Sequence, residues 1–399
     1  MFNTENRFPE TELTRRIQAM QTELKKTDTD AALILQRADL YYFSGTIQQA
    51  YLYVPVEGDP VLMVYRSQER ARAESNLALV EPLARPKDMP DILKRHGLKL
   101  PERLGMELDV LPTAQYFSFS ALFPDTEITD ISTAVRMIRS VKSGYELGLM
   151  RQAAALADRV AGMVPELVKE GMTELELAGK IEAEARKLGH QGVVRMRLWG
   201  SEIFYGHLLS GPSGAVPSYL SSPTGGTGPS PAAAQSAGFR KIQAFEPILV
   251  DYTFVHQGYL SDHARIFSLG GLAADLTEAH RAMLDLQGKL KKRIRPGALG
   301  GDIYEYALAF CESGGYADFF MGVGPQRIRF VGHGVGLELD EFPFLNQGQK
   351  LPLQAGMTIA LEPKLIFPGR GVVGTENTHV VTEDGLEQLG KFPDDICVI

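Results

Sequence analysis

The stretch of residues 248–267 reads ILVDYTFVHQGYLSDHARIF, and the interpretation of the whole chain begins there. Two strand-like apolar runs, Ile248–Thr253 and Tyr259–Phe267, flank the short polar segment His256-Gln257-Gly258. Runs of this length separated by a few turn-forming residues are typical of a β-hairpin. The sequence therefore predicts two neighbouring antiparallel strands here.

Each predicted strand carries one acidic residue. Asp251 and Asp262 are symmetric about the midpoint between His256 and Gln257. If those two residues form the turn, the aspartates face each other with their Cβ atoms about 5 Å apart. Two such carboxylates repel, and Asp is depleted in strands. We therefore expect a cation between them.

A second pair of acidic residues with the same symmetric spacing about a turn lies near the end of the chain. Two runs, Met357–Phe367 and Gly371–Val381, flank the turn-like segment Pro368-Gly369-Arg370. Glu362 and Glu376 are symmetric about Gly369, so a three-residue loop again places two carboxylates opposite each other. Either pair alone is as well explained by a solvated hairpin face. Two such pairs in one chain favour a metal site.

A histidine in an apolar segment completes the set. His333 lies in the stretch VGHGVGL (residues 331–337), where small neighbours leave room beside the ring. A lone histidine there is also explained as a hydrogen-bonded core residue. Four carboxylates and one imidazole suit Mn, Fe(II), Co or Zn. Four negative charges balance two divalent ions, which in such sites lie about 3.5–4 Å apart and activate a shared hydroxide. The expected ligands are Asp251, Asp262, His333, Glu362 and Glu376.

These motifs resemble those of the pita-bread metallopeptidases, the group of aminopeptidase P, prolidase, methionine aminopeptidase and creatinase. The resembling segments are GYLSDHAR (residues 258–265), GHGVGLE (332–338), Glu362-Pro363 and Glu376. All five ligands occur in the order and spacing of that group, over about residues 140–399.

The resemblance implies an α+β protein with two domains. A smaller N-terminal α/β domain of creatinase type would span residues 1–138, and a catalytic pita-bread domain residues 139–399. It also implies two divalent ions (Mn, Co, Zn or Fe), a homodimer, and hydrolysis at or near proline by a metal-bridged hydroxide. Glu362 would be both ligand and catalytic residue, carrying a proton from the bridging water to the leaving amine.

The chain also departs from the group's pattern. Histidines that commonly lie seven residues after and four residues before the metal histidine are replaced by Asp340 and Arg329. A third histidine of the group lies upstream of the first metal aspartate and binds substrate. Its nearest counterpart here is Ser218, and His207 is the alternative candidate for this role. The arginine commonly found two residues before the last glutamate is Gly374.

The replaced histidines donate hydrogen bonds to substrate, and losing one such donor costs about 10²–10³ in rate in well-studied sites. An ionised Asp340 only accepts, whereas Arg329 can donate. Our hypothesis is an ion pair between them at the pocket, with Arg329 as the catalytic oxyanion donor. The alternative is two unrelated surface charges.

Helix and strand signals alternate in the first third of the chain, with a helix expected at Thr11–Lys26 and a hairpin around residues 51–65. Beyond it, Ser143-Gly144-Tyr145-Glu146 has the form of a capping box opening a long helix. Strands are expected to dominate Val193–Leu269. Residues 221–236 are rich in Gly, Pro and Ser and predict a loop, either a plain surface loop or a lid.

Composition limits the remaining options. The chain has 399 residues, a net charge of -8 and two cysteines, Cys311 and Cys397. The charge disfavours nucleic acid as a partner, and the cysteines are expected to be reduced thiols. Without an apolar leader or a membrane-length apolar run, the protein is expected to be soluble and cytoplasmic.

Three functions compete at this stage. The first is a Xaa-Pro peptidase, either a dipeptidase or an aminopeptidase. The second is a creatinase-type hydrolase or lyase acting on a small C–N compound, favoured by the replaced histidines and by the carboxylate of Asp340. The third is a non-catalytic peptide-binding module, which does not require four clustered carboxylates.

Overall fold

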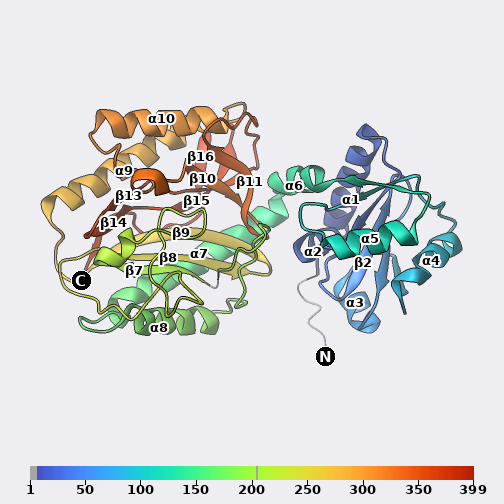
Figure 1. Ribbon diagram of the computed structural model, residues 1–399, viewed down its shortest axis with the longest axis horizontal. Coiled ribbons are helices and arrows are strands. Elements are labelled where there is room, and N and C mark those ends of the chain that lie inside the picture. Colours follow the sequence, from blue (N-terminus) through green and yellow to red (C-terminus); the bar gives the residue numbers. More distant parts are fainter. Residues whose placement is uncertain (1–6, 204) are drawn as a thin grey trace. The chain divides into compact units, whose positions relative to one another are not determined.

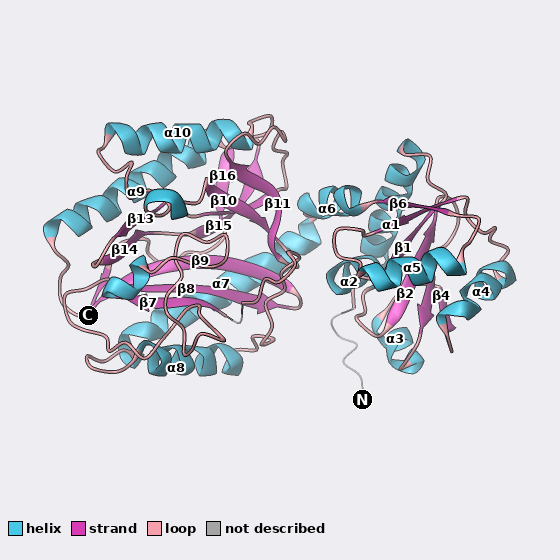
Figure 2. Ribbon diagram, in the orientation of Figure 1, coloured by secondary structure: helices cyan, strands magenta, loops and turns pink. Residues whose placement is uncertain are grey.

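The computed structural model describes residues 7–203 and 205–399. The chain divides into two units, Met1–Arg139 and Ser140–Ile399, one residue from the boundary expected from the sequence. Figure 1 shows the course of the chain through both units, and Figure 2 shows that each mixes helices and strands.

The N-terminal unit is a mixed six-stranded sheet in the order β4-β3-β2-β1-β5-β6. Its strands are β1 (Ala31–Ile34), β2 (Ala50–Pro55), β3 (Val61–Val64), β4 (Leu79–Pro82), β5 (Arg103–Met106) and β6 (Glu127–Asp130). Its helices are α1 (Glu10–Lys26), α2 (Arg37–Ser44), α3 (Gln68–Glu74), α4 (Met89–Arg95), α5 (Thr113–Leu122) and α6 (Ser132–Ser140). The expected first helix and hairpin are both present, with ends that differ by a residue.

The C-terminal unit has two main antiparallel-rich sheets, in the orders β17-β9-β8-β7 and β11-β10-β12-β15-β16, and the pair β13-β14. Its first strands are β7 (Gly206–Ser210), β8 (Ile248–His256), β9 (Tyr259–Ser268), β10 (Phe330–Val335), β11 (Leu339–Asn346) and β12 (Thr358–Leu361). The others are β13 (Lys364–Phe367), β14 (Gly371–Gly374), β15 (Asn377–Thr382), β16 (Gly385–Gln388) and β17 (Cys397–Val398).

Four long helices cover these sheets on their outer sides: α7 (Gly144–Leu167), α8 (Glu174–Lys187), α9 (Ala274–Arg293) and α10 (Gly300–Ser313). Helices α7 and α8 lie against the β7–β9 strands, whereas α9 and α10 lie over the strands of the last third (Figure 1). The predicted capping box at the start of α7 is confirmed, since Ser143 accepts from Glu146 N and Glu146 accepts from Ser143 N. None of the helices in the described residues is both long and apolar enough to cross a bilayer.

The helices bury the outer face of the β7–β9 sheet in an apolar core. Val164 of α7 and Ile181 of α8 belong to one cluster with Tyr252 and Phe254 of β8, all buried. Burying each such side chain contributes about 1.5–3 kcal/mol. Because one face of each strand is held in this way, the residues that alternate with it point to the opposite face. Asp251 and Thr253 are among them.

One prediction about this region is wrong. Between Val193 and the start of β8, residues 193–203 and 205–247 contain a single named strand, β7. The segment is otherwise loop and 3₁₀ turn, because its many glycines, prolines and serines favour turns over a continuous ladder.

Candidate metal centre

The β8–β9 hairpin presents its two aspartates on one face, but not directly opposite each other. Thr253 pairs with Asp262, and Asp251 pairs with Ala264. The turn consists of Gln257 and Gly258, with φ of 48° and 87°. Two positive φ values define a type I′ turn, for which a glycine in the second position is favoured.

The predicted turn at His256-Gln257 is therefore wrong by one residue. Moving a turn by one residue shifts the strand register by two. Side chains alternate with a period of two, so both aspartates still lie on the same face as diagonal neighbours.

The register of the second hairpin is confirmed. Phe367 pairs with Gly371 across the three-residue loop, and Leu361 pairs with Asn377 further along. Glu362 and Glu376 lie in the short break between these two ladders, at positions that the common register places opposite each other. An isolated bridge between Ala264 and Glu376 joins this region to β9. The two acidic pairs thus converge on one site.

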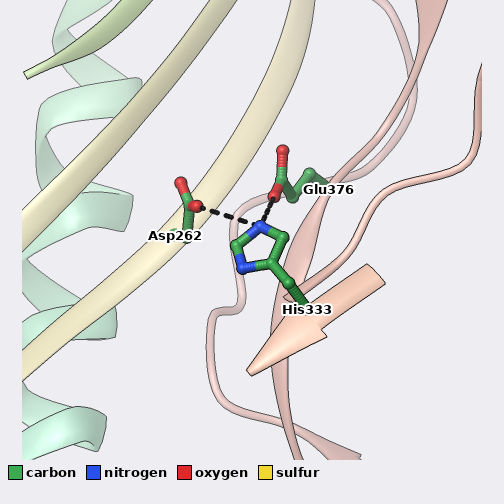
Figure 3. Close-up of side chains that lie close together, drawn as sticks. All are labelled: Asp262, His333 and Glu376. Carbon is green, nitrogen blue, oxygen red and sulfur yellow. Dashed lines mark ion pairs between the residues drawn. The ribbon is translucent and has the colours of Figure 1, made fainter. Parts of the chain in front are cut away.

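His333 lies on β10 and points its Nε2 atom toward three carboxylates. The distances from Nε2 are 3.8 Å to Asp262 Oδ2, 3.6 Å to Glu362 Oε1 and 3.8 Å to Glu376 Oε1. Figure 3 shows Asp262 of β9 and Glu376, from the segment between β14 and β15, turned toward this nitrogen. All of these side chains are buried.

These donor atoms fit one divalent ion. Two atoms that each bind an ion at about 2.1 Å are at most about 4.2 Å apart, and the three distances from His333 Nε2 lie below that limit. Ligand atoms of Asp262, His333 and Glu376 lie within 4.8 Å of one another. Carboxylates with an imidazole suit a Mn-, Fe-, Co- or Zn-type ion.

A lysine that the sequence analysis did not single out enters the same cluster. Lys364, the first residue of β13, donates from Nζ to Asp251 Oδ2 at 2.7 Å, Glu362 Oε2 at 2.8 Å and Glu376 Oε2 at 2.6 Å. Its side chain is 2% exposed. The site therefore contains a buried ammonium beside its four carboxylates.

The crowded charges shift the pKa values of the cluster. Burial, reinforced by the charge of Glu376, raises the pKa of Asp262 well above its ordinary range and that of Glu362 to about 7. Burial opposes the charged form of Lys364, but the surrounding carboxylates outweigh it and raise the pKa of the lysine. Burial also opposes the charged form of Glu376, but Lys364 and His333 outweigh it and lower the pKa of that carboxyl to about 2.

A cavity of about 390 Å³ opens over the cluster. Asp251, Asp262, His333, Glu362 and Glu376 line its polar part. Its wall also includes apolar side chains that are well exposed: Leu198 (45%), Trp199 (98%) and Tyr219 (59%). The donor atoms are thus accessible from a pocket with an apolar rim.

The two candidates for substrate binding differ in position. His207 of β7 lines the cavity, whereas Ser218 is absent from its described wall. Gln235 donates to His207 Nε2 at 2.6 Å, and Thr224 Oγ1 lies 3.0 Å from Nδ1. Burial lowers the pKa of His207 to about 4. The ring is neutral near pH 7, and the loop of residues 221–236 supplies both of its partners.

The expected ion pair between Arg329 and Asp340 is not formed, although both residues are described. Arg329 is exposed, donates to Gln347 Oε1 at 3.1 Å and is not part of the cavity wall. Asp340 lines the cavity, and its Oδ1 lies 3.4 Å from His333 Nδ1. The backbone of Asp340 has a φ of 62°. This backbone conformation turns the Asp340 carboxylate toward the imidazole, and spacing along the sequence did not predict it.

Two further residues of the site were missed. Thr253 donates from Oγ1 to Asp262 Oδ1 at 3.0 Å. Lys364 follows Glu362 by two positions, and in an extended chain such residues share a face. A lysine in the apolar stretch from Ala360 to Phe367 was the available signal.

Two antiparallel-rich sheets covered by outer helices, with a carboxylate and histidine cluster beneath an open cavity, define a metallohydrolase of the pita-bread class. Comparison with known proteins gives the family. Residues 148–383 match metallopeptidase family M24, and residues 16–141 match the Creatinase/Prolidase N-terminal domain. The chain belongs to metallopeptidase family M24.

Similar proteins extend over nearly the whole chain. A Xaa-Pro dipeptidase of Pyrococcus furiosus is 26% identical over 380 residues, which cover 94% of this chain and 97% of the relative. A solved X-Pro aminopeptidase from Thermotoga maritima has a TM-score of 0.80 at 23% identity and covers 96% of this chain and 99% of its own. A Xaa-Pro dipeptidase from Bacillus anthracis has a TM-score of 0.82 at 22% identity and covers 97% of this chain and 100% of its own. The predicted α+β pita-bread fold with an N-terminal creatinase-type domain is confirmed.

Proposed function

We propose that this protein is a metal-dependent Xaa-Pro peptidase that hydrolyses the bond before proline. The observation that carries the proposal is the convergence of Asp262, Glu362 and Glu376 on His333 Nε2 beneath an open cavity. Membership of metallopeptidase family M24 and similarity to Xaa-Pro dipeptidases and an X-Pro aminopeptidase support the substrate class.

Five residues form the proposed metal-binding set: Asp251, Asp262, His333, Glu362 and Glu376. A bound divalent ion in such a site polarises the scissile carbonyl and makes water a nucleophile at neutral pH. Asp262, His333, Glu362 and Glu376 are buried, and burial strengthens the electrostatic interactions of their side chains.

Two side chains have further proposed roles. Glu362 moves a proton from the attacking water to the leaving nitrogen, since it lies at the cavity floor. Asp340 helps to position the imidazole of His333, since its Oδ1 lies 3.4 Å from Nδ1, the atom that also contacts Gly334 O at 3.2 Å. Asp340 is thus a positioning residue, and Arg329 has no part in the proposed chemistry.

The shape of the cavity supports a small peptide as the substrate. Its volume of about 390 Å³ lies within the range of about 300–1,000 Å³ for small-molecule sites. The exposed rim of Leu198, Trp199 and Tyr219 can cover apolar side chains. His207 lies on the wall and is the proposed substrate-binding residue.

The creatinase-type alternative loses one of its two grounds. It was favoured by the replaced histidines and by Asp340 as a carboxylate for a cationic substrate, and in the structure this carboxylate faces His333. The metal identity, the homodimer and the cytoplasmic location expected from the sequence remain proposals. Manganese is our first choice of metal because the donor set is rich in oxygen.

A single assay tests the proposed function. The purified protein is stripped with a chelator, reloaded separately with Mn²⁺, Co²⁺ and Zn²⁺, and given Xaa-Pro dipeptides, longer Xaa-Pro peptides and matched Xaa-Ala peptides. We expect metal-dependent cleavage of the Xaa-Pro substrates, with the preferred length separating dipeptidase from aminopeptidase. Turnover of small N-methyl or amidino compounds without any peptide cleavage would contradict the proposal.

A further inference from the structure

The cluster contains two cation positions rather than one. Glu362 and Glu376 each direct Oε1 toward His333 and Oε2 toward Lys364. The distances from His333 Nε2 fit atoms that share an ion, whereas those from Lys364 Nζ, 2.6–2.8 Å, are hydrogen bonds to an ammonium. The two glutamates therefore join the donor set around His333 to a side chain that is itself a cation.

The lysine position is complete without any ion. An ammonium has three donors and no acceptor, and Lys364 gives one to each of three carboxylates, those of Asp251, Glu362 and Glu376. A divalent ion bound to the same three oxygen atoms would lie in contact with Nζ and would be repelled by its charge. The ammonium and a second ion therefore exclude each other.

A glycine opposite Lys364 allows the two strands of its hairpin to approach each other closely. Lys364 pairs with Gly374 across the β13–β14 hairpin. A Cβ atom at Gly374 would lie 2.3 Å from Pro363 O and 2.8 Å from Lys364 Cα. The close approach of the two strands places the root of the lysine directly beside the carboxylates.

We propose that the Lys364 ammonium takes the place of the second divalent ion, so that the site holds one ion, bound by Asp262, His333, Glu362 and Glu376. This inference rests on the metal site of the proposed function and revises the expectation of two ions. It also reduces the proposed metal-binding set from five residues to four, because Asp251 is then a partner of the lysine and not a metal ligand. Charge alone does not set the count, because with Lys364 protonated one divalent ion leaves the four carboxylates at a net charge of −1 and two ions leave them at +1; the proposal rests on the contacts of Lys364.

A consequence for the chemistry is that Asp262, His333, Glu362 and Glu376 would hold the one ion available to polarise the carbonyl and to activate water. The Lys364 ammonium cannot accept a hydrogen bond, and unlike a metal ion it cannot coordinate water or a carbonyl oxygen. Its contribution is to hold Glu362 and Glu376 with their Oε1 atoms facing the remaining donor set.

Metal stoichiometry tests the proposal without any substrate. The wild type and Lys364→Ala are reloaded with Mn²⁺, desalted and analysed for metal per chain by plasma mass spectrometry. We expect about one ion in the wild type and about two in Lys364→Ala, because the variant frees three oxygen ligands of the type that Mn²⁺ prefers. Electron paramagnetic resonance adds a second readout: isolated Mn²⁺ in the wild type and a spin-coupled pair in the variant.

Lys350→Ala, which removes an exposed lysine from the same unit, is the matched control and should keep one ion. Two ions in the wild type would overturn the proposal, as would one ion in a folded Lys364→Ala. If Lys364→Ala does not fold, the number of ions per wild-type chain still decides between a site with one ion and a site with two. Peptide assays are independent: cleavage of Xaa-Pro with two ions refutes this inference alone, and one ion without cleavage refutes the proposed function alone.

Discussion

The two hairpins that build the site balance their charges in different ways. The β8–β9 hairpin contributes Asp251 and Asp262 and no cation, whereas the β12–β15 region contributes Glu362, Glu376 and the buried Lys364. The β12–β15 region therefore contains a cation that balances part of its own negative charge, whereas the β8–β9 hairpin depends on a cation from elsewhere. The difference shows that residues equivalent in sequence pattern need not be equivalent in function.

The largest expected effect is the loss of metal and activity when Asp262 is replaced, in contrast to the replacement of Asp251. Asp262→Asn should abolish tight binding of the ion and lower kcat/KM by about 10³-fold, near the upper limit for removal of one transition-state-stabilising group. Asp251→Asn should retain the ion, because Asp251 faces Lys364 and an amide oxygen still accepts a hydrogen bond. Metal analysis and peptide kinetics of the two variants check this. Equal loss of metal from both would show that Asp251 is a metal ligand like Asp262 and that Lys364 does not replace an ion beside it.

A second prediction concerns the backbone of the hairpin that contains the lysine. Gly374→Ala should destabilise the protein by about 3–5 kcal/mol, from a strained φ of 134° together with overpacking against Pro363 O. Gly369→Ala, in the turn of the same hairpin, has a φ of 72° and open space around it. It should cost only about 1–2 kcal/mol. Urea unfolding measures both, and similar losses would contradict the close approach of the strands.

A third prediction separates positioning from ligation. Asp340→Asn should lower metal affinity or activity by about 10–100-fold, the usual effect of removing a partner of a metal-binding histidine. The control is Arg329→Ala, which should leave kcat/KM within a factor of a few because Arg329 is exposed and pairs with Gln347. A large loss in Arg329→Ala would restore the oxyanion role that the structure argues against.

The smallest expected effect is on the β8–β9 side. Thr253→Val removes the hydrogen bond to Asp262 Oδ1 and should cost about 0.5–1.5 kcal/mol in ion binding, the net contribution of a typical hydrogen bond. We expect weaker metal affinity with little change in KM. Isothermal titration with Mn²⁺ measures the affinity, and no change would mean that Asp262 is oriented by β9 alone.

Local patterns predicted the two hairpins and the carboxylates that meet at His333, because strand period and turn length act over a few residues, whereas the fold was predicted from the resemblance of the motifs to the pita-bread group. The register around Gly369 was predicted correctly, since a three-residue loop fits both flanking ladders. The turn at Gln257-Gly258 was misplaced because the choice between adjacent turns depends on which residues adopt positive φ. Such a choice is local, and the glycine at position 258 was the signal that should have decided it.

Contacts between distant segments were harder to predict. Lys364 became part of the site only when two sheets brought Asp251 and Glu376 to its ammonium. Arg329 and Asp340 were paired on charge alone, whereas the positive φ of Asp340 turns its carboxylate to His333. These outcomes depend on packing over long sequence separations, which spacing along the chain does not report.

The position of Trp199 gives this protein a built-in optical reporter. It is the single tryptophan of the chain, it is 98% exposed, and it belongs to the wall of the cavity above the metal centre. Its fluorescence should therefore emit at long wavelength and be quenched readily by iodide. A peptide that enters the cavity should shift the emission to the blue and shield the indole, so that ligand affinity can be titrated without a label or turnover.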